Sequence, residues 1–326
     1  MRVGAIVTLV PLAALIALAV GGTTLGPAEL LGALAHPGAH TEAATIVWSL
    51  RIPRIAIAAT VGATLAIAGT LMQALLRNPL VDPYITGVSS GAGAAIAIAV
   101  TLGVAMPAIP AIGFVAGLGT AILVAVLARR GTGLDAERLI LAGVSISALM
   151  SALVALALTR LAHGNSSDAI LAWLAGSLSG RGWPELAAAL PYAIVGTIVG
   201  AATIPALNVL RIGERRAATL GVDVVRLQWA LLAAAALLTA AAVALAGLVG
   251  FVGLIVPHLT RRLVGADLRL GMPIGAALGA ALVMIADAAS RSLFAPLEIP
   301  LGVLLAFIGV PVFLYLYLRG VNRAYA

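Results

Sequence analysis

The chain has 326 residues, of which 62% are hydrophobic and only 10% are charged, and its mean hydropathy is +1.15. No water-soluble globular domain has so apolar a composition. All 19 basic residues are arginine, the formal net charge is +7, and cysteine is absent, which excludes disulfides, thiol chemistry and cysteine-based metal sites. These features predict an all-α integral membrane protein.

Long charge-free windows separate the few charged residues, and a helix needs about 20 apolar residues to cross the hydrocarbon core. Most windows hold one span. The window after Asp82 folds back at Met106–Pro110, and Val256–His258 divides the window from Arg226 to Arg261 into a full helix and a short one. The chain 1–326 is then one transmembrane domain with ten predicted spans, at 5–22, 56–76, 87–105, 111–128, 138–159, 187–208, 228–249, 256–265, 273–291 and 299–318.

The first span is expected to stay in the protein, because its apolar run is too long for a signal peptide. The arginines give the orientation. With a cytoplasmic N-terminus, fourteen of the 19 arginines lie at cytoplasmic ends, as the positive-inside rule requires. Both termini are then cytoplasmic, and the basic pI of 10.9 reports topology and gives no reason to expect nucleic-acid binding. Five arginines remain at the outer ends: Arg51, Arg54, Arg160, Arg181 and Arg291.

A polar, broken passage follows the second span and contains Asn78, Pro79, Asp82, Pro83 and Gly87. Broken backbone at membrane depth is tolerated only where it is buried in protein or lines a water-filled cavity. The Asn78 and Asp82 side chains can satisfy backbone amides near the two prolines. We therefore interpret this passage as a structural hinge at the cytoplasmic end of the span, without direct contact to a substrate.

The sequence contains a weak internal repeat. AIAG at 66–69 recurs as ALAG at 244–247, and the same offset carries Pro79 onto Pro257. Because the second and seventh spans run in opposite directions, spans 2–5 and 7–10 would form an inverted repeat, which is common in transporters. Pro257 and His258 would then form the equivalent hinge, with His258 hydrogen-bonded to backbone that Pro257 frees.

Five segments, in order, resemble the permease subunits of type II ABC importers, a family that takes up cobalamin, heme and ferric siderophores. The resemblance runs from about residue 48 to 320. One departure is Leu268, where the family often carries a histidine. The segments are RIPR (51–54), GTLMQALLRNPLVDPYITGVSSGAG (69–93), GERRAATLG (213–221), GLVGFVGLIVPHLTRRLVGADLR (247–269) and EIPLGVLLAFIGVP (298–311).

The resemblance implies a homodimer in the bacterial inner membrane, with two cytoplasmic ATP-binding subunits below and a periplasmic substrate-binding protein above. The chain contains no GxxxxGK[ST] loop, so ATP and magnesium are expected on the partner subunit. No cluster of residues has the spacing of a metal site or a catalytic triad. We therefore expect a transport subunit that binds no cofactor and is not itself an enzyme.

The basic segment 211–226 matches the family's coupling loop to the ATP-binding subunit. We expect two short helices that are broken at Gly221, where glycine permits a tight turn. The alternative is an ordinary positive-inside loop. The residues that would contact the ATP-binding subunit are Gly213, Glu214, Arg215, Arg216, Ala217, Ala218, Leu220 and Gly221.

Arg51, Arg54 and Arg291 match the family's docking arginines, which meet acidic residues on the two lobes of the binding protein. Such charge pairs set register and encounter rate more than affinity. The alternative is that each arginine anchors at a lipid headgroup.

Asp287 is the deepest acid, and intramembrane acids are functional candidates by default. It could relay protons in a secondary transporter, which is the rival class of function for this chain. However, Arg291 lies one helical turn away, so a structural ion pair is favoured.

The resemblance implies a pathway along the dimer axis, lined mainly by the fifth and tenth spans. A mostly apolar lining with hydroxyls suits a bulky chelate better than a bare ion, which needs carboxylates. We expect heme or a ferric siderophore first and cobalamin next. The fifth span offers Ser145, Ser147, Met150, Ser151 and Leu156.

Overall fold

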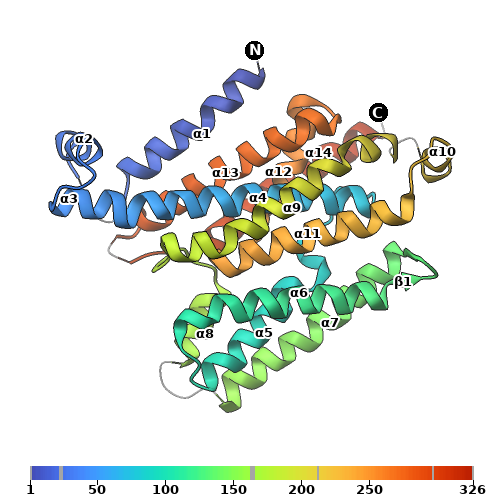
Figure 1. The fold of residues 1–326 in the computed structure, drawn as a ribbon, viewed down its shortest axis with the longest axis horizontal. Coiled ribbons are helices and arrows are strands. Elements are labelled where there is room, and N and C mark those ends of the chain that lie inside the picture. Colours follow the sequence, from blue (N-terminus) through green and yellow to red (C-terminus); the bar gives the residue numbers. More distant parts are fainter. Residues whose placement is uncertain (1, 22–24, 162–165, 211–212, 296, 325–326) are drawn as a thin grey trace.

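A computed structural model describes residues 2–21, 25–161, 166–210, 213–295 and 297–324. Nearly all regular structure is helical (Figure 1). The helices are α1 (Arg2–Ala19), α2 (Pro27–Ala35), α3 (Glu42–Thr45), α4 (Ile52–Leu75), α5 (Val88–Thr101), α6 (Ile109–Leu127), α7 (Ala136–Leu156), α8 (Ser166–Leu174), α9 (Trp183–Leu210), α10 (Glu214–Thr219), α11 (Val224–Ala246), α12 (Val252–Val264), α13 (Leu268–Ser292) and α14 (Leu301–Ala324).

Short elements join these helices. The π-helical turn η1 (Ile46–Arg51) joins α3 to α4, and the π-helical turn η4 (Ala157–Leu161) follows α7. The 3-10 turn η2 (Pro83–Thr86) lies just before α5, and the 3-10 turn η3 (Met106–Ala108) lies just before α6. The strands β1 (Arg129–Arg130) and β2 (Gly133–Leu134) pair antiparallel between α6 and α7. The sequence did not predict this hairpin.

Each predicted span overlaps a helix, and within the part of the chain that the structure describes six helical segments are long and apolar enough to cross a membrane. Three shorter apolar helices, at Thr8–Ala19, Val88–Thr101 and Leu301–Tyr315, accompany them, so the count of ten spans stays a prediction. The six segments are Glu42–Leu75, Met106–Leu127, Ala136–Thr159, Trp183–Leu210, Val224–Ala246 and Leu268–Ser292.

Helix α4 lies at the centre of the larger layer, packed against α9, α11, α12 and α13. It crosses its neighbours at glycines. A Cβ atom added to Gly62 would lie 2.0 Å from the carbonyl oxygen of Gly279, and one added to Gly69 would lie 1.9 Å from that of Gly253. Small residues at these positions let the helix backbones touch, which is how helices pack where lipid removes the hydrophobic driving force.

The window from Arg226 to Arg261 does divide into a full helix, α11, and a short one, α12, but the break lies at 247–251 and not at Val256–His258. Helix α12 begins at Val252 and contains Pro257. A proline inside a helix leaves the carbonyl four residues earlier without its amide donor. That carbonyl belongs to Gly253, and the side-chain Nε2 of Gln73 donates to it at 3.2 Å. Gln73 thus performs the task assigned to His258, whose own Nε2 is buried without a hydrogen-bond partner.

Helices α4 and α11, which begin the two predicted repeats, run in opposite directions. Ile57, early in α4, packs in the cluster that holds Leu245, late in α11, whereas Leu71 shares a cluster with Leu231. The offset that carries Pro79 onto Pro257, however, pairs residues that lie in different secondary structure. Pro79 lies between helices whereas Pro257 lies inside α12, so the motif alignment that suggested the repeat is wrong in register.

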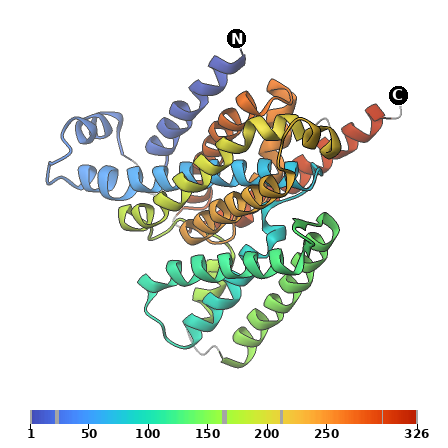
Figure 2. The ribbon, with the colours of Figure 1, turned by 45° about the vertical axis from the view of Figure 1, so that its right-hand side comes forward.

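Helices α5, α6, α7 and α8 form a second, smaller layer beside α11 (Figures 1 and 2). Val88 and Ala92 of α5 pack with Ala236 and Ala240 of α11 across the boundary. In this arrangement α7, the predicted pathway helix, lies at the outside of the single chain, on the side of the smaller layer away from α11.

Candidate docking and coupling sites

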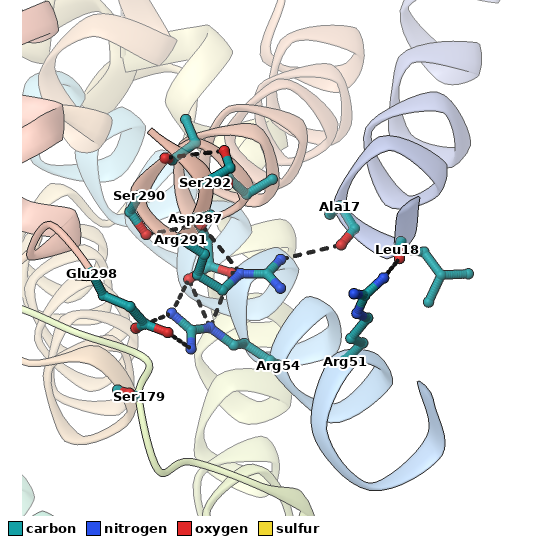
Figure 3. Close-up of polar contacts among 12 residues, drawn as sticks. Ala17, Leu18, Arg51, Arg54, Ser179, Asp287, Ser290, Arg291, Ser292 and Glu298 are labelled. Atoms are coloured by element: carbon teal, nitrogen blue, oxygen red, sulfur yellow. Dashed lines mark hydrogen bonds and ion pairs between the residues drawn. The ribbon is translucent and has the colours of Figure 1, made fainter. Parts of the chain in front are cut away.

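Five charged residues gather at one end of the larger layer (Figure 3). We call this group the outer charge cluster. It comprises Arg51 at the end of η1, Arg54 in the first turn of α4, Asp287 and Arg291 in α13, and Glu298 between α13 and α14.

Arg54 lies between the two acids of the cluster. Its Nε donates to both carboxylate oxygens of Asp287, at 3.0 and 3.1 Å. Its two terminal nitrogens form a bidentate pair with Glu298, at 3.2 and 3.0 Å. Two parallel charge-assisted bonds fix orientation as well as charge, and only arginine offers this fork.

Asp287 is fully buried and pairs with Arg291 as well, at 3.1 Å over four helix positions. The predicted ion pair is therefore present. This buried carboxylate joins α13 to α4, and removal of any member would leave a buried charge without its counter-ion.

Arg51 and Arg291 also bind the C-terminal end of α1. Arg51 donates to the carbonyl of Leu18, and Arg291 Nη2 donates to that of Ala17 at 3.1 Å. The last carbonyls of a helix have no intrahelical donors, so cations suit them. These two arginines are only 3% and 6% exposed, so Arg54 and Glu298 are the members of the cluster that reach its surface.

The sequence-predicted hinge residues form a compact turn between α4 and α5. The side chain of Asn78 accepts the amide of Leu80, and that of Asp82 accepts the amide of Tyr84, each at 2.9 Å. Such turns let the chain reverse after a proline. Gly87 follows with φ +76°. Burial raises the pKa of Asp82 to about 6, although the Tyr84 amide opposes the shift.

The Tyr84 hydroxyl ties this turn to the segment after α11. It donates to the carbonyl of Val249 at 3.0 Å and accepts the amide of the same residue at 3.1 Å. The hinge passage is thus anchored to the second half of the chain.

The coupling segment holds one short helix, α10, and the beginning of α11, so the expected pair of short helices is wrong. Gly221 ends the turn after α10 with φ +83°, and Asp223 then caps α11 by accepting the amide of Arg226 at 3.0 Å. Ala217 is fully buried, whereas Leu220 is 65% exposed. Arg215, Arg216 and Ala218 are exposed as well. Arg211 and the side chain of Glu214 lie outside the described residues.

The predicted lining residues of α7 do not share one face. At about 100° per residue, Ser145 and Ser147 point in nearly opposite directions. Ser147 hydrogen-bonds Ser90 of α5 at 3.0 Å, whereas Ser145, Ser151 and Leu156 are exposed in the single chain. The role of these residues in a pathway stays a prediction.

Two candidate functional residues, Gln73 and Glu298, were not predicted from the sequence. Gln73 is the only amide side chain in its apolar span, which is a usable signal for a buried polar role. Glu298 gave no local signal, because its partner Arg54 lies 244 positions away. Among the described residues, no group of three or more His, Asp or Glu could hold a metal ion.

Comparisons with known proteins cover nearly the whole chain. The sequence profile of the FecCD transport family matches residues 9–319. The hemin transport system permease protein HmuU of Yersinia pestis is 36% identical over 312 residues, 94% of this chain and 93% of that protein. The cobalamin import system permease protein BtuC of Halobacterium salinarum is 41% identical over 284 residues, 86% and 75% of the two chains.

A solved structure gives the same fold. It is described as an inward-facing conformation of a metal-chelate type ABC transporter, with a TM-score of 0.87 and 32% identity. The match covers 97% of this chain and 98% of that one.

Proposed function

The chain belongs to the FecCD transport family, and we propose that it is the membrane pathway of an ATP-driven importer that carries heme or a ferric siderophore, with cobalamin next. The observation that carries this proposal is a match over nearly the full length, in sequence and in fold. The chain is a permease of type II ABC importers for metal chelates, and the identity of the chelate is our proposal.

The assembly we propose contains two copies of this chain, two cytoplasmic ATP-binding subunits that hold ATP and magnesium, and a periplasmic binding protein. The absence of a P-loop from the sequence supports a separate ATPase. The arginine distribution supports an inner-membrane protein with both termini in the cytoplasm.

The substrate proposal rests on the chemistry of α7. Its outward side combines hydroxyls with large apolar groups such as Leu149 and Leu156, which are 54% and 50% exposed. Such a surface favours a bulky chelate over a bare cation.

Docking of the binding protein is proposed at the cluster of Arg51, Arg54 and Arg291, where Arg54 would make the contact and the buried Arg51 and Arg291 would hold the surrounding helices in place. Because Arg54 is the arginine near the surface and already holds Glu298, an incoming carboxylate must displace Glu298. Glu298→Gln should then speed association of the binding protein, and Arg54→Glu should slow it. Unchanged association rates for both variants would remove Arg54 from the interface.

The deciding experiment is uptake into proteoliposomes that contain the complete transporter, with ATP on the side of the ATPase. Hemin, a ferric siderophore and cobalamin are offered in parallel, and ATP-dependent uptake of one of them is expected. The alternative is a proton-coupled secondary transporter that uses Asp287. It is favoured if a protonophore abolishes uptake while ATP is abundant and Asp287→Asn does the same.

A further inference from the structure

The β1–β2 hairpin lies at the same end of the molecule as α10, opposite the outer charge cluster (Figure 1). Its strands pair Arg129 with Leu134 and Arg130 with Gly133. The amide of Asp135 closes the hairpin on the carbonyl of Ala128 at 3.1 Å. Hydrogen bonds of the hairpin and of Asp135 therefore hold the short connection between α6 and α7 in a fixed conformation.

Two side chains of α11 hold the hairpin in place. Gln228 Oε1 accepts the amide of Leu134 at 3.0 Å, and Trp229 Nε1 donates to the carbonyl of Thr132 at 3.1 Å. Both residues lie in the first two turns of α11, which follows α10 directly. The beginning of α11 thus binds the hairpin and is joined directly to α10, so it positions both.

A cleft of about 420 Å³ separates the hairpin from α10. Arg130 and Leu134 line one wall, Arg215 and Ala218 line the other, and Val225 lies between them. Arg130 is 73% exposed at its side chain. The cleft therefore has Val224 and Val225 at its floor and a guanidinium group on each side, and that of Arg130 is paired at 3.3 Å with Asp135, which also lines the cleft. An acidic side chain of the partner would share Arg130 with this exposed pair.

We infer that the hairpin and α10 together form the docking surface for the ATP-binding subunit, and that the cleft takes an acidic side chain of that subunit. This inference rests on the proposed function, because it extends the contact assigned to α10. Stable interfaces need about 20–30 residues on each side. Helix α10 has only six, so further segments must contribute.

Charge and apolar surface support the same partner. Arg130 and Arg215 line the cleft. Leu220 lies two residues after Ala218 of the lining and is 65% exposed, so it offers apolar contact area beside the cleft. Arginine is among the residues that carry much of the binding energy in protein interfaces, and apolar neighbours such as Leu220 exclude water around it. Since α7 begins directly after the hairpin, docking there would also act on the predicted pathway helix.

The first test measures association of the purified ATP-binding subunit of the same transporter with the permease in phosphatidylcholine nanodiscs. Arg130→Glu should lower the association rate about five- to tenfold at low ionic strength and less at high ionic strength, because steering charges act on encounter. Arg269→Glu is the matched control, since Arg269 is exposed at the same end but does not line the cleft. It should leave the rate unchanged.

A third variant separates this inference from the proposed function. If Arg215→Glu in α10 slows association and Arg130→Glu does not, the hairpin inference is overturned and coupling at α10 stands. If Arg215→Glu has no effect either, coupling at α10 itself fails. If Arg130→Glu matters only in nanodiscs that contain anionic lipid, the hairpin binds headgroups and the inference is overturned.

A second measurement is independent of charge. Because the chain has no cysteine, Thr132→Cys places one thiol at the exposed hairpin turn, while the backbone carbonyl still binds Trp229. Maleimide labelling of this thiol should be lost when the ATP-binding subunit is added, whereas labelling of Leu270→Cys should not change. Equal labelling of Thr132→Cys with and without the subunit would place the hairpin outside the interface.

Discussion

Replacing Asp287 by asparagine tests the outer charge cluster most directly. The carboxylate is fully buried and binds Arg54 and Arg291 at 3.0 and 3.1 Å. Removing one partner of a buried ion pair costs about 3–5 kcal/mol, because the remaining charge stays buried. Asparagine keeps one acceptor oxygen and Arg54 keeps Glu298, so we expect the low end, about 3 kcal/mol.

Thermal unfolding of the purified protein in detergent measures this loss. At about 2 °C per kcal/mol for a chain of this size, Tm should fall by about 6 °C. Asp223→Asn is the matched control, because it removes an exposed ion pair to Arg226 and keeps the helix cap. Exposed pairs contribute less than about 1 kcal/mol, so its Tm should barely change.

A charge-balanced double variant completes the test. Asp287→Asn combined with Arg291→Gln should recover part of the lost stability, because the two residues are coupled. If Asp287→Asn leaves Tm unchanged and still abolishes uptake, the ion-pair reasoning is refuted and a proton-carrying role is favoured.

Three further predictions concern the helix crossing, the coupling segment and the hinge. Gly62→Ala should sharply lower the yield of monodisperse protein, because its Cβ would lie 2.0 Å from a backbone oxygen, whereas Gly119→Ala, with nothing within 4 Å, should not. Gly221→Val forces a β-branched residue to φ +83°, at about 1–2 kcal/mol, and should leave ATP hydrolysis intact while uptake falls; normal uptake would contradict it. The pKa of Asp82, raised to about 6, implies stability that is fully present below the unfolded value of 3.8 and lost as pH rises through 6. Asp82→Asn should remove this slope in unfolding measured from acid to neutral pH, and a persistent slope would assign it to another group.

The long helices were predictable because the signal is local. A charged side chain is costly in the hydrocarbon core, so the charges mark helix ends directly. Arg129, for example, lies two residues after the end of α6, and Arg138 lies in the first turn of α7. The beginning of α12 at Val252, before Pro257, was not predictable, because the hydrogen bond that the proline removes is replaced by one from Gln73, 180 positions away.

The same distinction applies to the candidate sites. The pair of Asp287 and Arg291 follows from helical spacing and is present. The pairing of Arg54 with Glu298, and the contact of Arg51 with the end of α1, depend on how distant helices pack. Composition and spacing contain no information about those contacts.

The division into two layers limits how the molecule can change shape. Segment 88–174 joins the rest of the chain at its two ends, and beside each end lies a glycine with positive φ, Gly87 at +76° and Gly176 at +74°. Between these two ends the layer is also bound to α11, through the packing of Val88 and Ala92 and through the hydrogen bonds of Gln228 and Trp229 to the hairpin. A change of shape that keeps these contacts therefore moves the layer together with α11.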